Sequence, residues 1–280
     1  MKNVVMEKLR IFTFWEPKDR LPGYVRLCMQ TWKKFLPDAE VVVCDYETVR
    51  HYLSEEEFEA VDFRHMSLPK QSDAIRCALL HKHGGIWMDA DTIVTSASGI
   101  QNLQQGDCCM LNNGKEHMLF GAYIYAAQPN SRFIRSWYEQ LLPRIAAYKK
   151  AWRYRCFRFL FRKAWKRMKS WDYCENAIID PIAARMSSPE FVELKGMELG
   201  VIPERISMKE GESPKDAYIR FWFTEGAEVP VSAEVGGLLF LHNSWTPEKY
   251  RTMDETTFMK QDIPMAKLLN KLLRNDSDLM

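Results

Sequence analysis

The fold of this chain is decided by residues 72–91, which read SDAIRCALLHKHGGIWMDAD. Apolar residues recur at helical spacing in the first half, so we expect a helix over about 72–83 with Ser72 as its N-terminal cap. A Gly-Gly pair then ends the helix, and Ile-Trp-Met is typical of a short buried strand. Asp89 and Asp91 therefore follow the end of a strand, which is the edge where open α/β sheets bind ligands.

Strands and helices alternate on both sides of this stretch. Short apolar or β-branched runs predict strands over residues 11–15, 40–44, 119–127 and 236–241. Helical spacing of apolar residues predicts further helices over residues 25–36 and 131–142. This alternation predicts an α/β fold with a largely parallel sheet in the first half of the chain. We expect residues 1–280 to form a single domain, with a frayed polar tail over 275–280.

The composition favours a folded protein and indicates no particular partner by bulk charge. Of the 280 residues, 46% are hydrophobic and 12% aromatic, which is ample for a large core, and the formal net charge is only +2. The seven cysteines include no C-x-x-C pair of a zinc or redox site, which favours a reducing compartment. No signal-peptide core and no run of roughly 20 apolar residues occurs. We therefore expect a soluble or peripheral protein.

The pair Asp89 and Asp91 is a candidate metal site because of its context. The same Asp-x-Asp pattern occurs in the polar tail at residues 276–278, so the pattern alone is weak. Two carboxylates this close repel each other unless a cation lies between them. Oxygen ligands favour Mg²⁺ or Mn²⁺, which can bridge to phosphates and stabilise a departing diphosphate. The alternative interpretation is a turn with two solvated aspartates.

The combination of Ser-Asp-x-x-Arg with Gly-Gly-Ile-Trp-x-Asp-x-Asp resembles the Och1-like and capsular-polysaccharide glycosyltransferases. The clostridial glucosylating toxins have a similar catalytic core. Three further segments resemble the same family: residues 11–15, Trp32 with residues 36–38, and residues 241–245. The resemblance covers about residues 9–130 and 238–246 and is poor over 143–235.

The resemblance implies a GT-A-type fold for nucleotide-diphospho-sugar transfer, with a Rossmann-like mixed sheet flanked by helices. It also implies a nucleotide-sugar donor (a UDP-sugar is favoured), Mn²⁺ or Mg²⁺, and retention of anomeric configuration. The catalytic positions that it implies are Asp73, Arg76, Asp89 and Asp91. Its donor-binding positions are Phe14, Trp15, Ser72, Asp73, Arg76, Asp89, Ala90, Asp91 and Trp245. Its metal positions are Asp89, Asp91, His242 and Ser244.

Individual roles also follow from the resemblance. Asp91 would bind the metal directly, and Asp89 would contact the ribose or metal-bound water. Asp73 would accept hydrogen bonds from sugar hydroxyls, and the guanidinium of Arg76 would lie near the sugar and phosphates. Trp15 would line the base pocket.

The candidate acceptor-side residues by position are Asn112, Asn113 and Asp180. Retention allows a covalent intermediate on a carboxylate or attack from the same face as the leaving group. No carboxylate stands out by spacing as a nucleophile. We therefore favour same-face attack.

Residues 144–169 differ from the rest of the chain because they contain eleven Lys or Arg and no acid, interleaved with aromatic residues. We expect a basic amphipathic helix, or a pair of helices, inserted over 144–170. A solvated helical face and a nucleic-acid surface are two interpretations. The favoured one is a helix on an anionic membrane, with Trp and Phe at the interface. A lipid-linked saccharide acceptor on the cytoplasmic side of a bacterial membrane would suit it, with no nucleic-acid partner.

Three other functions stay open at this stage. A degenerate, membrane-associated scaffold would keep the fold without turnover, although it has no use for paired acids at a metal site. A nucleotide-sugar hydrolase or phosphotransferase would use the same metal. A toxin-like transferase would modify a protein instead of a saccharide.

Overall fold

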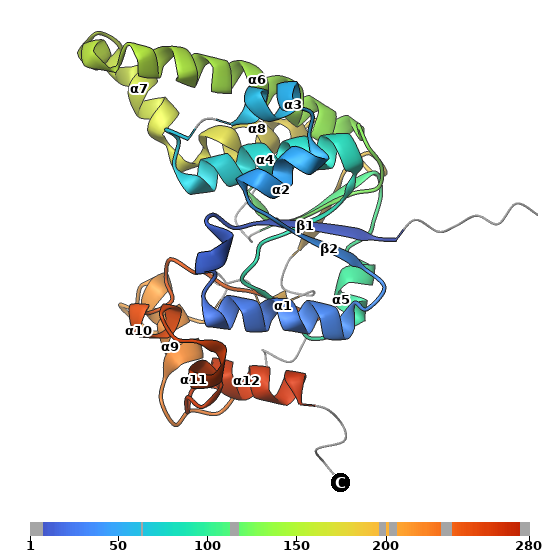
Figure 1. The fold of residues 1–280 in the computed structure, drawn as a ribbon, viewed down its shortest axis with the longest axis vertical. Helices are drawn as coiled ribbons and strands as arrows, with labels where there is room; N and C mark the ends of the chain where they lie inside the picture. Colours follow the sequence, from blue (N-terminus) through green and yellow to red (C-terminus); the bar gives the residue numbers. More distant parts are fainter. Residues whose placement is uncertain are drawn as a thin grey trace, which may run out of the picture.

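The computed structural model describes residues 8–62, 64–112, 118–195, 200–201, 206–230 and 237–274. A six-stranded sheet crosses the middle of the molecule, with helices on both sides (Figure 1). In the order β2-β1-β3-β6-β5-β7, its strands are Glu40–Cys44, Arg10–Phe14, Gly85–Met88, Leu119–Ala126, Cys108–Asn112 and Val192–Lys195. β6 is antiparallel to β3 and β5, and the other neighbouring pairs are parallel. The predicted α/β class is confirmed, and the mixed sheet agrees with a GT-A-type arrangement.

A second, three-stranded sheet has the order β4-β9-β8, with β4 at Thr92–Val94, β9 at Leu238–Phe240 and β8 at Gly200–Val201. β4 begins directly after Asp91. Because β9 pairs antiparallel to β4, with Thr92 opposite Phe240, the loop that follows β9 is brought beside Asp91. The small sheet thus joins the C-terminal part of the chain to the Asp-x-Asp turn.

Both faces of the large sheet are covered by helices, which explains the nearly continuous apolar character of its strands. Neighbouring residues of one strand point to opposite faces, so that Ile11 packs in one core and Phe12 in the other. On one side lie α2 at Tyr46–Tyr52, α3 at Glu55–Val61, α4 at Leu68–His83, α6 at Arg132–Arg153 and α8 at Asn176–Ala183. On the other lie α1 at Gly23–Phe35, α5 at Ala97–Asn102, α9 at Pro214–Phe223, α10 at Glu248–Arg251, α11 at Glu255–Met259 and α12 at Pro264–Leu273.

Two predicted helix bounds were wrong. α4 begins at Leu68, so Ser72 lies inside the helix and is not its cap; the proline at position 69 fits the first turn, where no backbone N–H is needed. α6 runs to Arg153 and not to residue 142, with Pro143 inside it. The helix continues past this proline because Ile145 and Tyr148 keep its apolar face buried against the core.

The basic segment forms a projecting arm, which we define as residues 144–170. It consists of the end of α6, a 3-10 helix η2 at Arg155–Phe161 and α7 at Arg162–Lys169, and it leads into a second 3-10 helix, η3, at Trp171–Cys174 (Figure 1). Of the two arrangements expected, the structure has the pair of helices. No described helix is both long and apolar enough to cross a membrane.

Some predictions fall outside the described residues. These are Gly236 at the start of the last predicted strand, Asn113 among the acceptor candidates, and the tail 275–280. The single-domain organisation stays a prediction.

Candidate active site

The candidate site lies at the carboxyl edge of the large sheet, where β1 and β3 end. α4 precedes β3 in the chain and runs back across the sheet, so its first turns reach the same edge. The end of α4 is set by Gly84, whose φ of 64° suits a residue without a side chain. Asp89 leaves β3 with its backbone N–H bonded to the carbonyl of Ala122 on β6 at 2.9 Å.

Arg76 is the centre of the site and is only 6% exposed. One end of its guanidinium, Nη2, lies 3.0 Å from Oδ1 of Asp73 and 3.7 Å from Oδ1 of Asp89. The other end, Nη1, lies 2.7 Å from Oε1 of Glu175 and donates to the carbonyl oxygen of Gly121 at 2.6 Å. The planar fork therefore holds residues from four separate parts of the chain in one cluster: α4, the end of β3, β6 and the segment before α8.

Gly121 is needed for this packing. A Cβ atom placed on Gly121 would lie 1.8 Å from Oε1 of Glu175 and 2.5 Å from Nη1 of Arg76, which is too close for either. The absence of a side chain lets Arg76 and Glu175 reach the backbone of β6. A side chain at this position would separate the two.

The carboxylates of the cluster interact strongly with one another and with the guanidinium of Arg76. Burial, followed by the neighbouring Glu175, raises the pKa of Asp73 well above its usual value, and Arg76 opposes this. Burial also raises the pKa of Glu175. Burial alone would lower the pKa of Arg76, but the carboxylates of Glu175, Asp89 and Asp73 raise it above its usual value. One guanidinium thus faces an excess of acids, which suits a site that binds a cation or polyhydroxylated ligand.

Asp91 is held from the opposite side by the loop that follows β9. Its Oδ2 accepts a hydrogen bond from the backbone N–H of Asn243 at 2.8 Å. The side-chain oxygen of Asn243 in turn accepts from the hydroxyl of Tyr24 on α1 at 2.7 Å. Burial and then the charge of Asp89 raise the pKa of Asp91 to about 7, while the Asn243 hydrogen bond lowers it. The predicted proximity of the C-terminal loop to the aspartate pair is therefore seen in the fold.

The same loop places three aromatic rings together near Asp91. The rings of His242 and Trp245 lie 4.2 Å apart, and Trp245 meets Tyr218 of α9 edge to face at 5.7 Å. The charge of His242 lowers the pKa of Asp91, so the two side chains interact electrostatically. Ser244 is exposed in the turn.

Asp89 and Asp91 have the chemistry of a divalent metal site. Oδ1 of Asp89 accepts from the indole N–H of Trp87 at 2.8 Å, and Oδ2 of Asp91 accepts from Asn243. Burial and then the charge of Asp89 raise the pKa of Asp91, and a bound cation would relieve the repulsion between the two carboxylates. The two residues therefore fit Mn²⁺ or Mg²⁺, although the described residues include no group of three or more His, Cys, Asp or Glu suited to a metal.

The remaining donor-side candidates differ in position. Trp15 follows β1 at the same edge and is half-buried, with its backbone N–H bonded to the carbonyl of Cys44. Phe14 is buried beneath Tyr46, whose ring lies 5.4 Å away. Ala90 is buried between the two aspartates, and Ser72 is half-buried on α4. Phe14 and Ala90 could meet a donor only through their backbone in this arrangement.

The acceptor candidates lie along the same edge beside Leu119, where β6 starts. Asp180 on α8 accepts from the backbone N–H of Leu119 and from the amide of Asn176, each at 3.2 Å. Asn112 ends β5 opposite Leu119 and donates to Glu193. Both side chains are engaged within the protein, and their role toward an acceptor stays a prediction.

Sequence reasoning missed Glu175, Gly121, Asn243 and Tyr24. Glu175 is only 7% exposed and lies just before α8. An acid two residues before the apolar run Ala-Ile-Ile was the available signal for Glu175. The partners of the other three could be found only from the tertiary structure.

The comparison with known families matches this chain to "Capsular polysaccharide synthesis protein" over residues 1–182. This range includes Arg76 and its three acidic partners as well as the arm, where the sequence resemblance was poor, but not the His242–Trp245 loop. Among solved structures, the PaToxG glycosyltransferase aligns at 14% identity with a TM-score of 0.36, covering 51% of this chain and 63% of that one. No curated protein matches the chain.

Proposed function

This chain belongs to the family of capsular polysaccharide synthesis proteins, and we propose that it is a glycosyltransferase. In this proposal it transfers a sugar from a nucleotide-diphosphate donor, with a UDP-sugar favoured, to a saccharide acceptor in surface polysaccharide synthesis. The reaction depends on Mn²⁺ or Mg²⁺ and retains the anomeric configuration.

The observation that carries the proposal is the cluster of the buried Arg76, Asp73 and Glu175 with the half-buried Asp89, beside Asp91. Gathering four acids and one guanidinium at the carboxyl edge of a sheet costs desolvation free energy, and groups perturbed in this way cluster at functional sites. Asp73 and Arg76 supply hydrogen-bond acceptors and donors that match the hydroxyls of a sugar. A structural core at the same place would be served better by apolar residues.

The protein holds these groups in place before a donor binds. Trp87 orients the carboxylate of Asp89, and the backbone N–H of Asn243 orients that of Asp91. Glu175 and Gly121 fix the guanidinium of Arg76. Groups that are already oriented need no reorganisation as charge develops in the reaction.

Asp89 and Asp91 would hold the metal, with the His242–Ser244 loop beside them. When bound, the metal would neutralise charge on the departing diphosphate. The protein itself would contribute the fixed orientation of both carboxylates. The half-buried Trp15 would line the pocket for the nucleotide base.

Same-face attack is supported over a covalent intermediate by the state of the buried acids. Asp73 and Glu175 are both paired with Arg76, at 3.0 Å and 2.7 Å, and such pairing reduces their nucleophilicity. Attack on the donor carbon by either carboxylate would require the pair to break. In same-face attack the acceptor hydroxyl loses its proton to the leaving phosphate as the new glycosidic bond forms.

Isothermal titration with UDP- and GDP-sugars, with and without Mn²⁺, tests the proposal. We expect one donor to bind only with metal, and Asp91→Asn to weaken that binding at least tenfold. Asp38→Asn is the matched control, because Asp38 is exposed just before β2 at the opposite edge of the sheet. Folded protein that binds no donor would contradict the proposal and favour a scaffold.

A further inference from the structure

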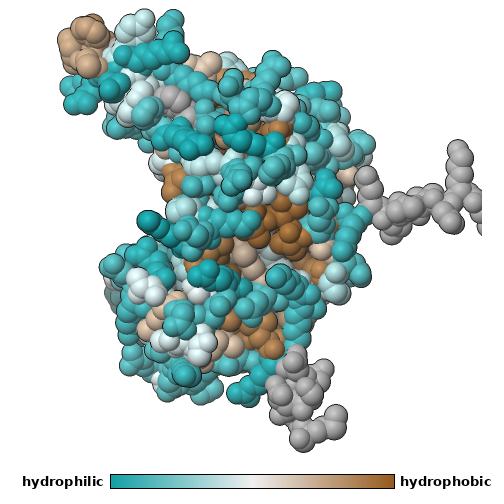
Figure 2. Space-filling view, in the orientation of Figure 1, coloured by the Kyte–Doolittle hydropathy of each residue, from teal (hydrophilic) through white to brown (hydrophobic). Residues whose placement is uncertain are grey.

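The tip of the arm exposes an unusual group of apolar side chains. Residues 153–160 are all exposed, and among them Tyr154 is 55%, Phe157 55%, Phe159 65% and Leu160 72% exposed. Only three other large hydrophobic residues in the described chain are exposed to a comparable degree, so the tip is a concentrated patch. Figure 2 shows it as a brown group of atoms at the end of the projection at the upper left.

The arm behind the tip is packed, which makes the exposed tip a feature of a folded element. Tyr148 and Met168 are buried, and the ring of Trp152 stacks on that of Trp165 at 6.0 Å. Trp152 also stacks on His65 at 4.7 Å. Both tryptophans are half-buried in the arm, and the expectation that Trp lies at a membrane interface stays a prediction.

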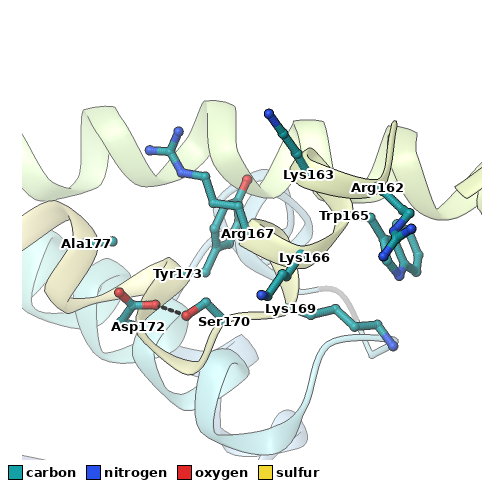
Figure 3. Close-up of a pocket in the computed structure, with 10 residues that line it drawn as sticks. All are labelled: Arg162, Lys163, Trp165, Lys166, Arg167, Lys169, Ser170, Asp172, Tyr173 and Ala177. Carbon is teal, nitrogen blue, oxygen red and sulfur yellow. Dashed lines mark hydrogen bonds between the residues drawn. The ribbon is translucent and has the colours of Figure 1, made fainter. Parts of the chain in front are cut away.

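Cations surround the tip. None of the eleven Lys and Arg of residues 144–169 forms an ion pair with an acid in the described chain, although Arg144 and Lys149 donate to backbone carbonyls. Figure 3 shows a pocket beside α7 that is lined by cations together with Trp165 and Tyr173: Arg162, Lys163, Lys166, Arg167 and Lys169. Asp172, the acid in this lining, accepts a hydrogen bond from Ser170. The pocket therefore presents an excess of positive charge.

We propose that the arm docks the protein on an anionic lipid bilayer. Phe157, Phe159 and Leu160 would enter the boundary between headgroups and acyl chains, and the cations would lie on lipid phosphates, including one in the pocket beside α7. A merely solvated face does not expose phenylalanine and leucine together. Leu160, the most exposed of these residues, has no ring to stack on a nucleic-acid base, which favours lipid over nucleic acid.

The arm is tied to the candidate active site. Nζ of Lys70, three residues before Asp73 on α4, donates to the carbonyl oxygen of Met168 in α7 at 3.0 Å. Arg144 donates to the carbonyl oxygens of Tyr173 and Ala177, on either side of Glu175. Docking would therefore hold the site near the bilayer surface, where a lipid-linked saccharide could reach it. That last benefit rests on the proposed function, whereas the docking itself does not.

Flotation of the full chain with vesicles tests the docking. We expect binding to phosphatidylcholine vesicles that contain phosphatidylglycerol and much weaker binding to phosphatidylcholine alone, with a loss of binding at high salt. Replacing Phe157, Phe159 and Leu160 together by serine should weaken binding at least tenfold. Met208→Ser is the control, because Met208 is 53% exposed but lies outside the arm.

A second variant tests the charge separately. Changing Arg158, Arg162 and Lys163 to glutamine should weaken binding about 100-fold, at roughly fivefold per cation. The same change at three exposed lysines elsewhere, Lys33, Lys215 and Lys260, should leave it within about threefold, since binding falls only with charge near the surface. Because all these side chains are exposed, the variants should fold, and circular dichroism checks this.

Three outcomes would overturn the docking: no binding to anionic vesicles, equal binding to neutral ones, or binding unaffected by both variants. Tip-dependent binding of single-stranded RNA without vesicle binding would also overturn it and assign the arm to nucleic acid. Donor titration on the same samples separates this result from the proposed function. A protein that binds donor but no vesicle rejects the docking alone.

Discussion

Arg76 and the arm use positive charge in opposite ways. Arg76 is a single buried cation in contact with Asp73, Asp89 and Glu175, whereas the arm carries eleven Lys and Arg without an acid in its own sequence and exposes most of them. Buried charge must be satisfied by partners, so Arg76 determines where its partners lie. Exposed charge needs none and stays available to a partner outside the protein. Buried positive charge therefore positions the side chains of the candidate site, whereas the exposed positive charge of the arm can bind a partner outside the protein.

The largest effect is expected from removing the buried cation. Arg76→Met leaves Asp73 and Glu175 buried without their partner, and we expect the free energy of unfolding to fall by about 3–5 kcal/mol. Arg158→Met makes the same change at an exposed position of the arm and should alter stability by about 0.5 kcal/mol or less. Urea denaturation followed by circular dichroism measures both. Equal losses of the free energy of unfolding in the two variants would contradict the distinction between the buried Arg76 and the exposed cations of the arm.

Asp91→Asn should separate activity from stability. Sugar transfer should fall by roughly 10²–10³-fold, because one of the two carboxylates that would hold the metal is lost. The fold should persist, since asparagine can still accept the hydrogen bond from Asn243. Initial rates with saturating donor and Mn²⁺ are the measurement, with Asp38→Asn beside it. Full activity of the Asp91→Asn variant would exclude Asp91 from the active site.

Glu175→Gln tests whether an acid that sequence reasoning missed positions Arg76. The neutral amide keeps a hydrogen bond but not the charge, and we expect kcat/KM to fall by about 10–100-fold. Glu190→Gln is the matched control, because Glu190 pairs with Arg132 at the surface and should leave kcat/KM unchanged. A loss confined to stability, with kcat/KM unaltered, would make Glu175 a purely structural residue.

Most of the site could be predicted because it is local in sequence. Asp73, Arg76, Asp89 and Asp91 lie within residues 72–91, where helical spacing, the Gly-Gly end and the short strand place them at one edge. Glu175 is 99 residues away from Arg76 and depends on how α8 packs. No spacing rule indicates such a contact.

The packing of side chains within the arm could not be predicted from the sequence either. The charge and aromatic content of its sequence were sufficient to predict a basic helical element. The stacking of Trp152 on Trp165 depends on how α7 folds back along α6, which the sequence pattern does not specify. The tip residues were therefore identified only when the tertiary structure showed which aromatic side chains are exposed.

The raised pKa of Asp91 predicts a pH effect on the protein stripped of metal. With a pKa near 3.9 when unfolded and about 7 when folded, the folded state binds more protons between these values, so stability falls as pH rises through this window. Asp91→Asn should therefore gain stability relative to the unsubstituted protein as pH rises from 5 to 8. Thermal melts in chelator at several pH values measure the difference. A gap between the two proteins that does not change with pH would contradict the raised pKa of Asp91, which burial and then the charge of Asp89 cause.

The smallest effect on stability is expected from the tip of the arm. Phe157→Ser and Phe159→Ser should each change the free energy of unfolding by about 0.5 kcal/mol or less, since both side chains are exposed. Denaturant titration is again the measurement. A loss above about 2 kcal/mol would mean that the tip packs within the protein.

The most direct test of the account follows the donor sugar by NMR during turnover with Mn²⁺, using water as acceptor until the natural one is known. We predict that the protein releases nucleoside diphosphate only with metal and that the first sugar product keeps the donor's anomeric configuration. Asp91→Asn should slow the reaction by roughly 10²–10³-fold, and Asp38→Asn should not slow it. Folded, metal-loaded protein that consumes no donor, or a first product with inverted configuration, would contradict a retaining glycosyltransferase at this site.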